Sequence, residues 1–168
     1  MRPTPEWFES GLERIRSSPR DCGVVELIVR RPRPGEREIL TAARLDVVEG
    51  LMGDYWISSA AAGQPSHADM QLSVMNSRVM ALLAHERSLW GRSGDQLFVD
   101  LDLSGANLPP GTQLAVGDAV IVVSSQSHAT CKAFASRFGA LAAQFVHSRA
   151  GRSLRLRGIN AGVVRSGT

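Results

Sequence analysis

The pattern of hydrophobic and polar positions predicts a helix near the N-terminus. Residues 4–18 carry four large apolar side chains at helical spacing, namely Trp7, Phe8, Leu12 and Ile15. Thr4 is suited to the N-cap, because its hydroxyl accepts a hydrogen bond from the first turn, and Pro5 is suited to the first helical position. We therefore expect a helix that packs against the rest of the domain through one apolar stripe.

Beyond Gly23 the period changes from helical to alternating. Short β-branched and apolar runs between turns predict strands over 24–29, 38–48, 70–75, 97–103, 119–126 and 153–165. Residues 104–118 are expected to be loop-rich, and helices are expected over 77–89, capped by Asn76, and over 139–148. This order predicts a mainly β fold, a β-barrel with a few packed helices. Residues 1–168 are expected to form one domain, with 4–18 as the N-terminal helix and 23–165 as the barrel region.

The composition is that of a soluble globular protein, with 43% hydrophobic and 21% charged residues. No apolar stretch is long enough to cross a bilayer, and the N-terminal segment has no apolar signal region. We therefore expect a cytoplasmic protein with no membrane partner. Its two cysteines, Cys22 and Cys131, are too few for a disulfide framework and are expected to be thiols.

The net charge is +3, and arginine supplies 18 of the 19 positive side chains. Residues 149–168 contain no acid and five arginines, at positions 149, 152, 155, 157 and 165. This segment predicts contact with an anion, or else a solvated strand face. Aromatic residues make up only 5% of the chain, so base stacking is poorly supplied and a nucleic-acid partner is not expected.

Cys131 follows the predicted strand 119–126, where a rigid strand gives way to a turn. His128, Lys132 and Arg137 are close to it in sequence, and positive neighbours stabilise a thiolate. A thiolate binds soft metals or carries an extra sulfur as a persulfide. Residue types alone leave a second interpretation open, in which Cys131 is a small buried hydrophobic residue.

Four short motifs resemble those of the MOSC family, named for the C-terminal domain of molybdenum cofactor sulfurases. They are Gly50-Leu51-Met52-Gly53-Asp54, Gln71-Leu72-Ser73-Val74, Leu114-Ala115-Val116-Gly117-Asp118 and the single late Cys131. The segment Arg157-Gly158-Ile159-Asn160-Ala161-Gly162-Val163-Val164 resembles the family's C-terminal strand. The resemblance extends over about residues 23–165 and depends on the order and spacing of these motifs.

The resemblance implies a MOSC-type β-barrel that binds the molybdenum cofactor, with Cys131 as the molybdenum ligand or as a persulfide sulfur carrier. Family members act in sulfuration of the cofactor or in reduction of N-hydroxylated compounds. The implied partners are an external electron donor or a cysteine desulfurase. On electrostatic grounds, the candidates for the anionic phosphate of the pterin are Lys132, Arg137, Arg155 and Arg157. Further cofactor-binding candidates are Asp54, His128 and Thr130.

Two other functions remain open. One is a non-catalytic module that binds an anion or a partner through the arginine-rich C-terminal strand. The other is a MOSC-like scaffold without cofactor, which the aromatic pair Tyr55-Trp56 after the glycine–acid turn suggests. Three minor expectations concern other residues. Asp100 and Asp102 form a carboxylate pair or a solvated strand face, Cys22 is structural, and His85 and His147 are surface or packing residues.

Overall fold

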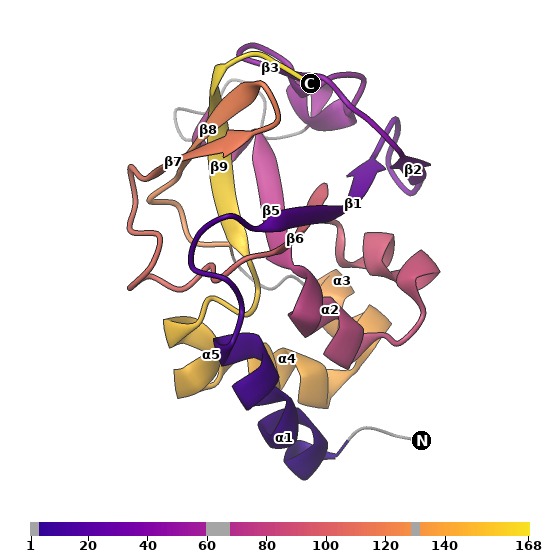
Figure 1. Cartoon of the computed structure of the whole chain (residues 1–168). Coiled ribbons are helices and arrows are strands. Elements are labelled where there is room, and N and C mark those ends of the chain that lie inside the picture. The colour runs from indigo at the N-terminus through magenta and orange to yellow at the C-terminus, as the bar shows by residue number, and fades with distance from the viewer. Residues whose placement is uncertain (1–3, 60–67, 129–131) are drawn as a thin grey trace.

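The structure is a computed structural model that describes residues 4–59, 68–128 and 132–168. Its central element is a curled seven-stranded sheet, a half-barrel, in the order β2-β1-β6-β5-β9-β8-β7 (Figure 1). The strands of this sheet are β1 Val24–Arg30, β2 Glu38–Leu40, β5 Leu72–Asn76, β6 Leu97–Asp100, β7 Gln113–Val116, β8 Ala119–Val123 and β9 Ile159–Arg165. A separate two-stranded sheet pairs β3 Leu45–Asp46 with β4 Gly50–Leu51.

The helices gather at one end of the half-barrel (Figure 1). They are α1 Pro5–Arg16, α2 Ser77–Leu83, α3 Lys132–Phe138, α4 Ala140–His147 and α5 Arg149–Ser153. Three 3-10 helices lie in the connections, η1 Tyr55–Ser58, η2 Ala68–Met70 and η3 Arg87–Ser93. The predicted sheet-based fold with packed helices, including one at the N-terminus, is therefore confirmed as a half-barrel.

Two hydrophobic cores lie on the two faces of the central strands β5 and β6. On β6, Leu97 and Val99 belong to the core inside the curled sheet, whereas Phe98 between them belongs to the core beneath the helices. On β5, Val74 and Met75 divide in the same way. Successive side chains of a strand point to opposite faces, so a strand covered on both faces is apolar throughout. The two strands are parallel and are joined through α2 and η3.

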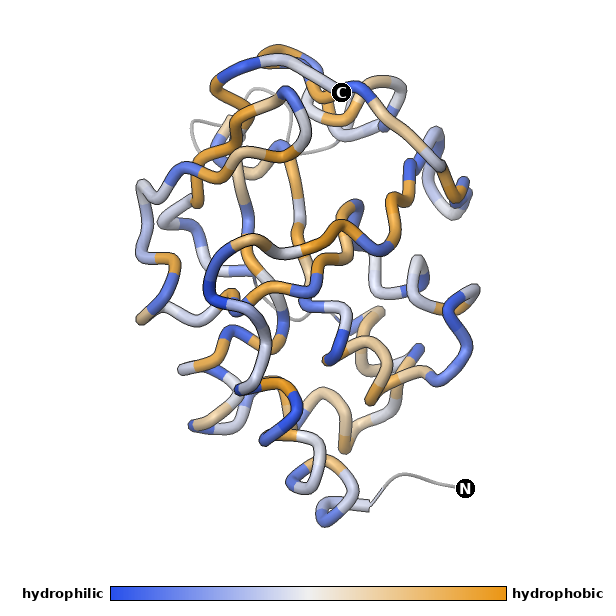
Figure 2. The backbone as a smooth tube through the Cα atoms, viewed as in Figure 1, coloured by the Kyte–Doolittle hydropathy of each residue, from blue (hydrophilic) through white to orange (hydrophobic). Residues whose placement is uncertain are grey.

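The predicted N-terminal helix is confirmed as α1. The Thr4 hydroxyl accepts a hydrogen bond from the Trp7 backbone N–H at 3.3 Å, and Phe8, Leu12 and Ile15 are buried. The helix packs on α2 and α4, and the ring of Phe8 stacks on that of Phe145 at 4.9 Å. Figure 2 shows α1 as a mixture of blue, white and orange, as expected for a helix with one buried face, whereas β1 is largely orange.

Several predicted boundaries were wrong. The helix capped by Asn76 ends at Leu83 instead of 89. The chain leaves helical geometry at Ala84, and a separate 3-10 helix, η3, begins at Arg87. The segment 38–48 forms two short strands in different sheets. The loop-rich segment 104–118 also contains a short strand, β7, which pairs with β8. The last predicted strand begins at Ile159 instead of 153, because the chain first forms α5 and a turn.

The motifs of the family resemblance have structural roles of their own. Gly53 adopts φ +77°, a conformation that favours glycine, and so turns the chain from β4 towards Asp54. Gln71 ties two distant segments together: its side-chain oxygen accepts from Val163 N–H at 2.6 Å, and its side-chain amide donates to Val47 O at 2.8 Å. These contacts explain why the fold needs such residues whatever the site binds.

No helix among the described residues is long and apolar enough to cross a membrane.

The side chain of Asn76 connects three parts of the fold. Its oxygen accepts from Arg78 N–H and Val79 N–H, and its amide donates to Ser18 Oγ and Leu101 O. We predict that Asn76→Ala lowers the free energy of unfolding by about 2–3 kcal/mol, since it removes a helix cap and leaves buried groups unpaired. Urea unfolding measures the change. Ser10→Ala, which removes one exposed hydrogen bond, is the control and should change stability by less than about 0.5 kcal/mol. Equal stability of the two variants would contradict this role for Asn76.

Candidate anion-binding site

A buried ion pair lies where β1 ends. Arg31 follows β1 directly, and its guanidinium binds both oxygens of Asp54, with Nε–Oδ2 at 2.9 Å and Nη2–Oδ1 at 2.8 Å. The Asp54 carboxylate also accepts from Arg31 N–H and from Trp56 N–H, which caps η1. The Asp54 side chain is fully buried, and the Tyr55 ring lies 5.4 Å from the Arg31 guanidinium. The guanidinium of Arg31 is therefore held along one edge by Asp54 and over one face by Tyr55.

A second buried ion pair joins the start of β6 to the segment before β9. Arg157 Nη1 lies 3.0 Å from Asp95 Oδ1 and 2.9 Å from Oδ2, and the Asp95 side chain is fully buried. The Phe134 ring lies 5.0 Å from the same guanidinium. Burial, the largest single effect, raises the pKa of Asp95, but Arg157, His128 and Ser93 together outweigh it and hold this pKa below its ordinary value. Asp95 is therefore an anion in the folded protein at neutral pH.

The segment that leads into β9 requires a glycine at position 158. Gly158 adopts φ +93°, and a Cβ added there would lie 2.3 Å from Val74 O. The absence of a side chain lets the segment carrying Arg157 lie against β5, and so brings Arg157 to Asp95.

His128 completes the second cluster. Its Nε2 lies 3.5 Å from Asp95 Oδ1, and its Nδ1 lies 3.4 Å from Arg157 O. Burial lowers the pKa of His128 to about 4, although the nearby carboxylate opposes this effect. The imidazole is therefore neutral at physiological pH, and the charge of the cluster is set by Arg157 and Asp95.

Two further arginines have no carboxylate partner among the described residues. Arg37 donates from Nε to Gly91 O at 3.1 Å and from Nη1 to Glu36 O, and Arg137 donates from Nη1 to Arg92 O at 2.7 Å. Burial, followed by the positive charges of Arg31 and Arg137, lowers the pKa of Arg37. The guanidinium groups thus repel one another, and in the part of the chain described no acid within salt-bridge distance offsets Arg37 or Arg137.

These groups line one cavity of about 360 Å³, here called the arginine pocket. Its charged and titratable lining residues are Arg31, Arg37, Arg137, Arg157, His128 and Tyr55, and no Asp or Glu is among the described residues that line it. Two of the four guanidinium groups are neutralised by Asp54 and Asp95, which leaves about two unbalanced positive charges. Arg157 Nε adds a buried N–H that has no hydrogen-bond partner among the described residues. This is the arrangement expected of a pocket for a multiply charged anion.

The structure brings some of the predicted site residues together and separates others. Arg137, Arg157 and His128 share the arginine pocket, whereas Arg155 lines a different cavity. Lys132 is exposed at the start of α3, and Asp54 acts on the pocket through Arg31. Two predicted residues, Thr130 and Cys131, lie outside the described residues.

The prediction of an arginine-rich C-terminal strand was wrong. Of the five arginines in residues 149–168, only Arg165 lies on β9. The others lie on α5 or in the turn before the strand, namely Arg149, Arg152, Arg155 and Arg157. Arg157 is moreover buried, so the arginines do not form one solvated strand face.

Two other expectations also need correction. Asp100 and Asp102 do not form a carboxylate pair, since Asp100 binds Arg78 at 2.7 Å while Asp102 accepts from Ser104 N–H. Cys22 is an exposed free thiol with φ +52°, and not a buried structural residue. Within the described residues no group of three or more His, Cys, Asp or Glu side chains is arranged to hold a metal ion.

Sequence reasoning missed Arg31, Arg37 and Asp95. The first two lie in or just after the Arg/Pro/Gly turn following β1, where charged residues are usually solvated. Asp95 follows Gly94, whose φ of +94° ends η3. The Gly50–Asp54 motif indicated Asp54 but not its partner, Arg31. The two residues are 23 positions apart, and an ion pair at that separation produces no periodic pattern in the sequence.

No family model and no curated protein matches the chain. Among solved structures, the YuaD protein from Bacillus subtilis is similar with a TM-score of 0.60 at 16% identity, covering 87% of this chain and 91% of that protein. A hypothetical protein of known crystal structure is similar with a TM-score of 0.56 at 18% identity, covering 84% of this chain. The match spans 60% of that second protein's length. At these identities the comparisons show a shared fold.

His128 makes stability depend on pH. In the unfolded chain a histidine takes up a proton near pH 6.5, but folded His128 does so only near pH 4, so acidification across this window favours unfolding. We predict a loss of about 3 kcal/mol from this residue between pH 6.5 and 4. His128→Gln should lack this part of the pH dependence in urea unfolding, whereas His85→Gln, a change at an exposed histidine, should retain it. Identical pH profiles for His128→Gln and the unaltered protein would contradict the assignment.

The Asp95–Arg157 pair should be far more important to stability than an exposed pair of similar length. We predict that Asp95→Ala lowers the free energy of unfolding by about 3–5 kcal/mol, because it leaves the Arg157 charge buried and unpaired. The control is Glu38→Ala, which breaks the half-exposed Arg30–Glu38 pair of 2.6 Å and should cost at most about 1 kcal/mol. Thermal unfolding of both variants measures the difference. Similar losses in the two would show that burial does not govern these pairs.

Proposed function

We propose that this protein binds a molybdenum cofactor in the arginine pocket, as a half-barrel of the MOSC type, with Cys131 as metal ligand or persulfide carrier. The observation that carries the proposal is the pocket's uncompensated charge, supplied by Arg37 and Arg137. His128 and Ala133 line this pocket, and in the sequence they stand on either side of Cys131. The motif resemblance adds the expectation that the cysteine belongs to the same site.

The donor set fits the anionic part of such a cofactor. A phosphate monoester carries close to two negative charges and three acceptor oxygens, and the pocket offers about two unbalanced positive charges on guanidinium groups. Arg37 and Arg137 would hold the phosphate directly. Arg31 and Arg157 would present their remaining N–H groups, since Asp54 and Asp95 fix their orientation. The unpartnered Nε of Arg157 is one donor that a bound ligand or a small rearrangement would satisfy.

Two reactions are compatible with this proposal. When bound, the cofactor supplies two-electron redox chemistry. In reduction of an N-hydroxylated compound the N–O bond breaks, two electrons and two protons are consumed, and water leaves. The electrons must then come from an external donor protein. In sulfur transfer, Cys131 carries a sulfane sulfur delivered by a cysteine desulfurase and passes it to an acceptor, and the thiol is restored.

The alternative is a non-catalytic module that binds an anion without a metal. The positive charge of the pocket is compatible with this alternative, because the described arginines can bind an anion without Cys131. The two proposals differ in one measurable respect, namely whether metal retention depends on the cysteine.

Molybdenum content separates them. We predict that protein purified from a host that makes molybdenum cofactor contains close to one molybdenum per chain by elemental mass spectrometry, and that Cys131→Ser loses nearly all of it. Cys22→Ser, a change at the exposed free thiol, should keep the unaltered content. The double variant Arg37→Gln/Arg137→Gln should reduce the content at least tenfold, by loss of two charge-assisted contacts.

Near-zero molybdenum in both the unaltered protein and Cys131→Ser would rule out metal ligation. A Cys131 peptide heavier by one sulfur atom in the intact protein would then indicate the persulfide role. An unmodified thiol in the same protein would leave the anion-binding module as the function.

A further inference from the structure

A second cavity lies beside the arginine pocket and shares two side chains with it. It has a volume of about 350 Å³ and lies between the loop after β8, helix α5 and the segment that leads into β9. His128 and Arg157 line both cavities. We define this second cavity, the serine–arginine pocket, by the polar residues Ser124, Ser125, Ser127, Arg152 and Arg155.

The charge of the serine–arginine pocket is not offset. Among the described residues, none of those that line it is acidic, and neither Arg152 nor Arg155 lies within salt-bridge distance of a carboxylate. Arg155 Nη1 donates to Leu108 O at 2.6 Å, and Arg152 Nη1 donates to His147 O. Each arginine therefore uses one N–H on a carbonyl and keeps other donors for a ligand.

The backbone at Arg155 is held in an unusual conformation. Its φ is +48°, in the left-handed region that a non-glycine residue rarely adopts. Partial burial also lowers the pKa of Arg155, so the guanidinium lies where its charge is poorly solvated. A strained backbone that presents a partly desolvated cation is a combination found at ligand sites.

The pocket also has apolar walls, formed by Val146 and Ile159. A lining that combines hydroxyl and guanidinium donors with aliphatic side chains matches an organic molecule that ends in an anion. A phosphoryl group has three acceptor oxygens, so it can accept hydrogen bonds from both guanidinium groups and from serine hydroxyls at once. A carboxylate has two oxygens and can accept from fewer of these donors.

We propose that the serine–arginine pocket is a second anion site, which binds the phosphoryl group of a phosphorylated organic ligand through Arg152 and Arg155. The organic part of the ligand lies against Val146 and Ile159. This site is separate from the arginine pocket and does not depend on the proposed cofactor or on Cys131.

Phenyl phosphate is the probe, because it combines a phosphoryl group with an apolar ring. Calorimetric titration of the full chain at low salt should show two phenyl phosphate molecules bound per chain. The double variant Arg152→Gln/Arg155→Gln should bind one, with affinity at the lost site reduced tenfold or more. Arg37→Gln/Arg137→Gln should lose the other molecule and keep this one.

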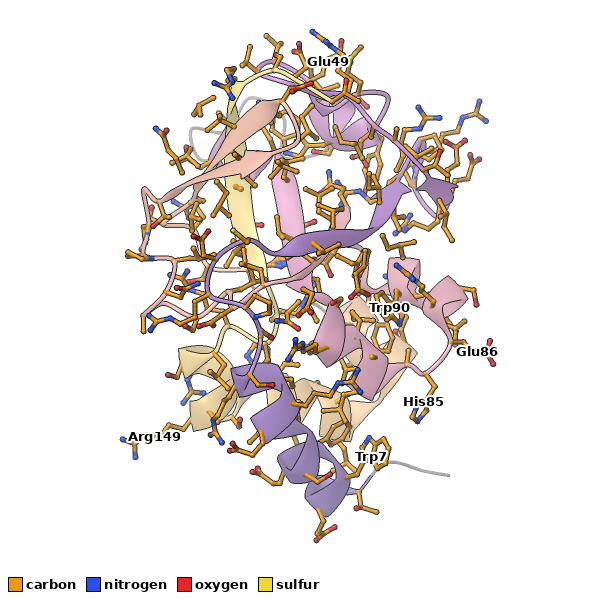
Figure 3. All side chains as sticks on the ribbon, viewed as in Figure 1. Trp7, Glu49, His85, Glu86, Trp90 and Arg149 are labelled. Atoms are coloured by element: carbon orange, nitrogen blue, oxygen red, sulfur yellow. The ribbon has the colours of Figure 1, made fainter. Side chains whose placement is uncertain are left out.

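Arg149→Gln is the matched control. Arg149 is on the same helix as Arg152 and is exposed, and Figure 3 shows its side chain directed away from the ribbon. This variant removes one positive charge from the same helix without touching the pocket, so it should bind both molecules. Arg155→Lys keeps the charge and should retain more affinity than Arg155→Gln if the contact is electrostatic.

The contribution of the apolar walls is tested with inorganic phosphate. It should bind the serine–arginine pocket at least several-fold more weakly than phenyl phosphate, because it lacks the ring that contacts Val146 and Ile159.

Three results would overturn the proposal. They are a single bound molecule that both double variants abolish, equal weakening by Arg149→Gln, or unchanged two-site binding in Arg152→Gln/Arg155→Gln. Thermal unfolding of each variant shows whether it is folded, and Arg152→Gln alone, a change at an exposed side chain, gives a folded variant if the double variant is unstable. Failure of molybdenum binding in the Cys131 experiment leaves this result unaffected, so the two proposals fail independently.

Discussion

The ion pair between Asp95 and Arg157 is the interaction on which the rest of the site depends. It joins the start of β6 to the segment before β9, across a fully buried carboxylate. In an apolar interior an isolated charge of either sign is strongly unfavourable, so each partner requires the other. Arg157 also contacts Phe134 of α3 and lines both cavities, so the same pair connects the sheet, a helix and the two pockets.

The two buried pairs explain how four arginines are held near one cavity. Asp54 and Asp95 lie behind the lining and offset Arg31 and Arg157, which reduces the repulsion that four guanidinium groups would otherwise exert on one another. Within the part of the chain that the structure describes, Arg37 and Arg137 donate to carbonyl oxygens, which orient them without cancelling their charge. The fold thus tolerates the residual repulsion, and a bound anion would relieve it.

The fold was predicted best where local chemistry decides the conformation. Helix α1 followed from its cap and apolar stripe, and Asn76 was found as a cap because its side chain bonds the first turn. The errors occurred where tertiary packing outweighs local preference. β7 alternates exposed and half-buried residues and is a strand because it pairs with β8, while Cys22 is exposed because of where the chain turns into β1.

The sequence by itself determined the sheet-based class, the excess of arginine and the candidates His128, Arg137 and Arg157. These follow from residue type and spacing, which are properties of the chain before it folds. Only the tertiary structure decided that Arg157 is buried against Asp95, that Arg31 and Arg37 join the same pocket, and that Arg155 belongs to a different one. The physical reason is that burial and pairing depend on contacts between residues far apart in the sequence, such as Arg31 and Gly94, which are 63 positions apart. Such contacts set which charges are compensated, and no spacing along the chain encodes them.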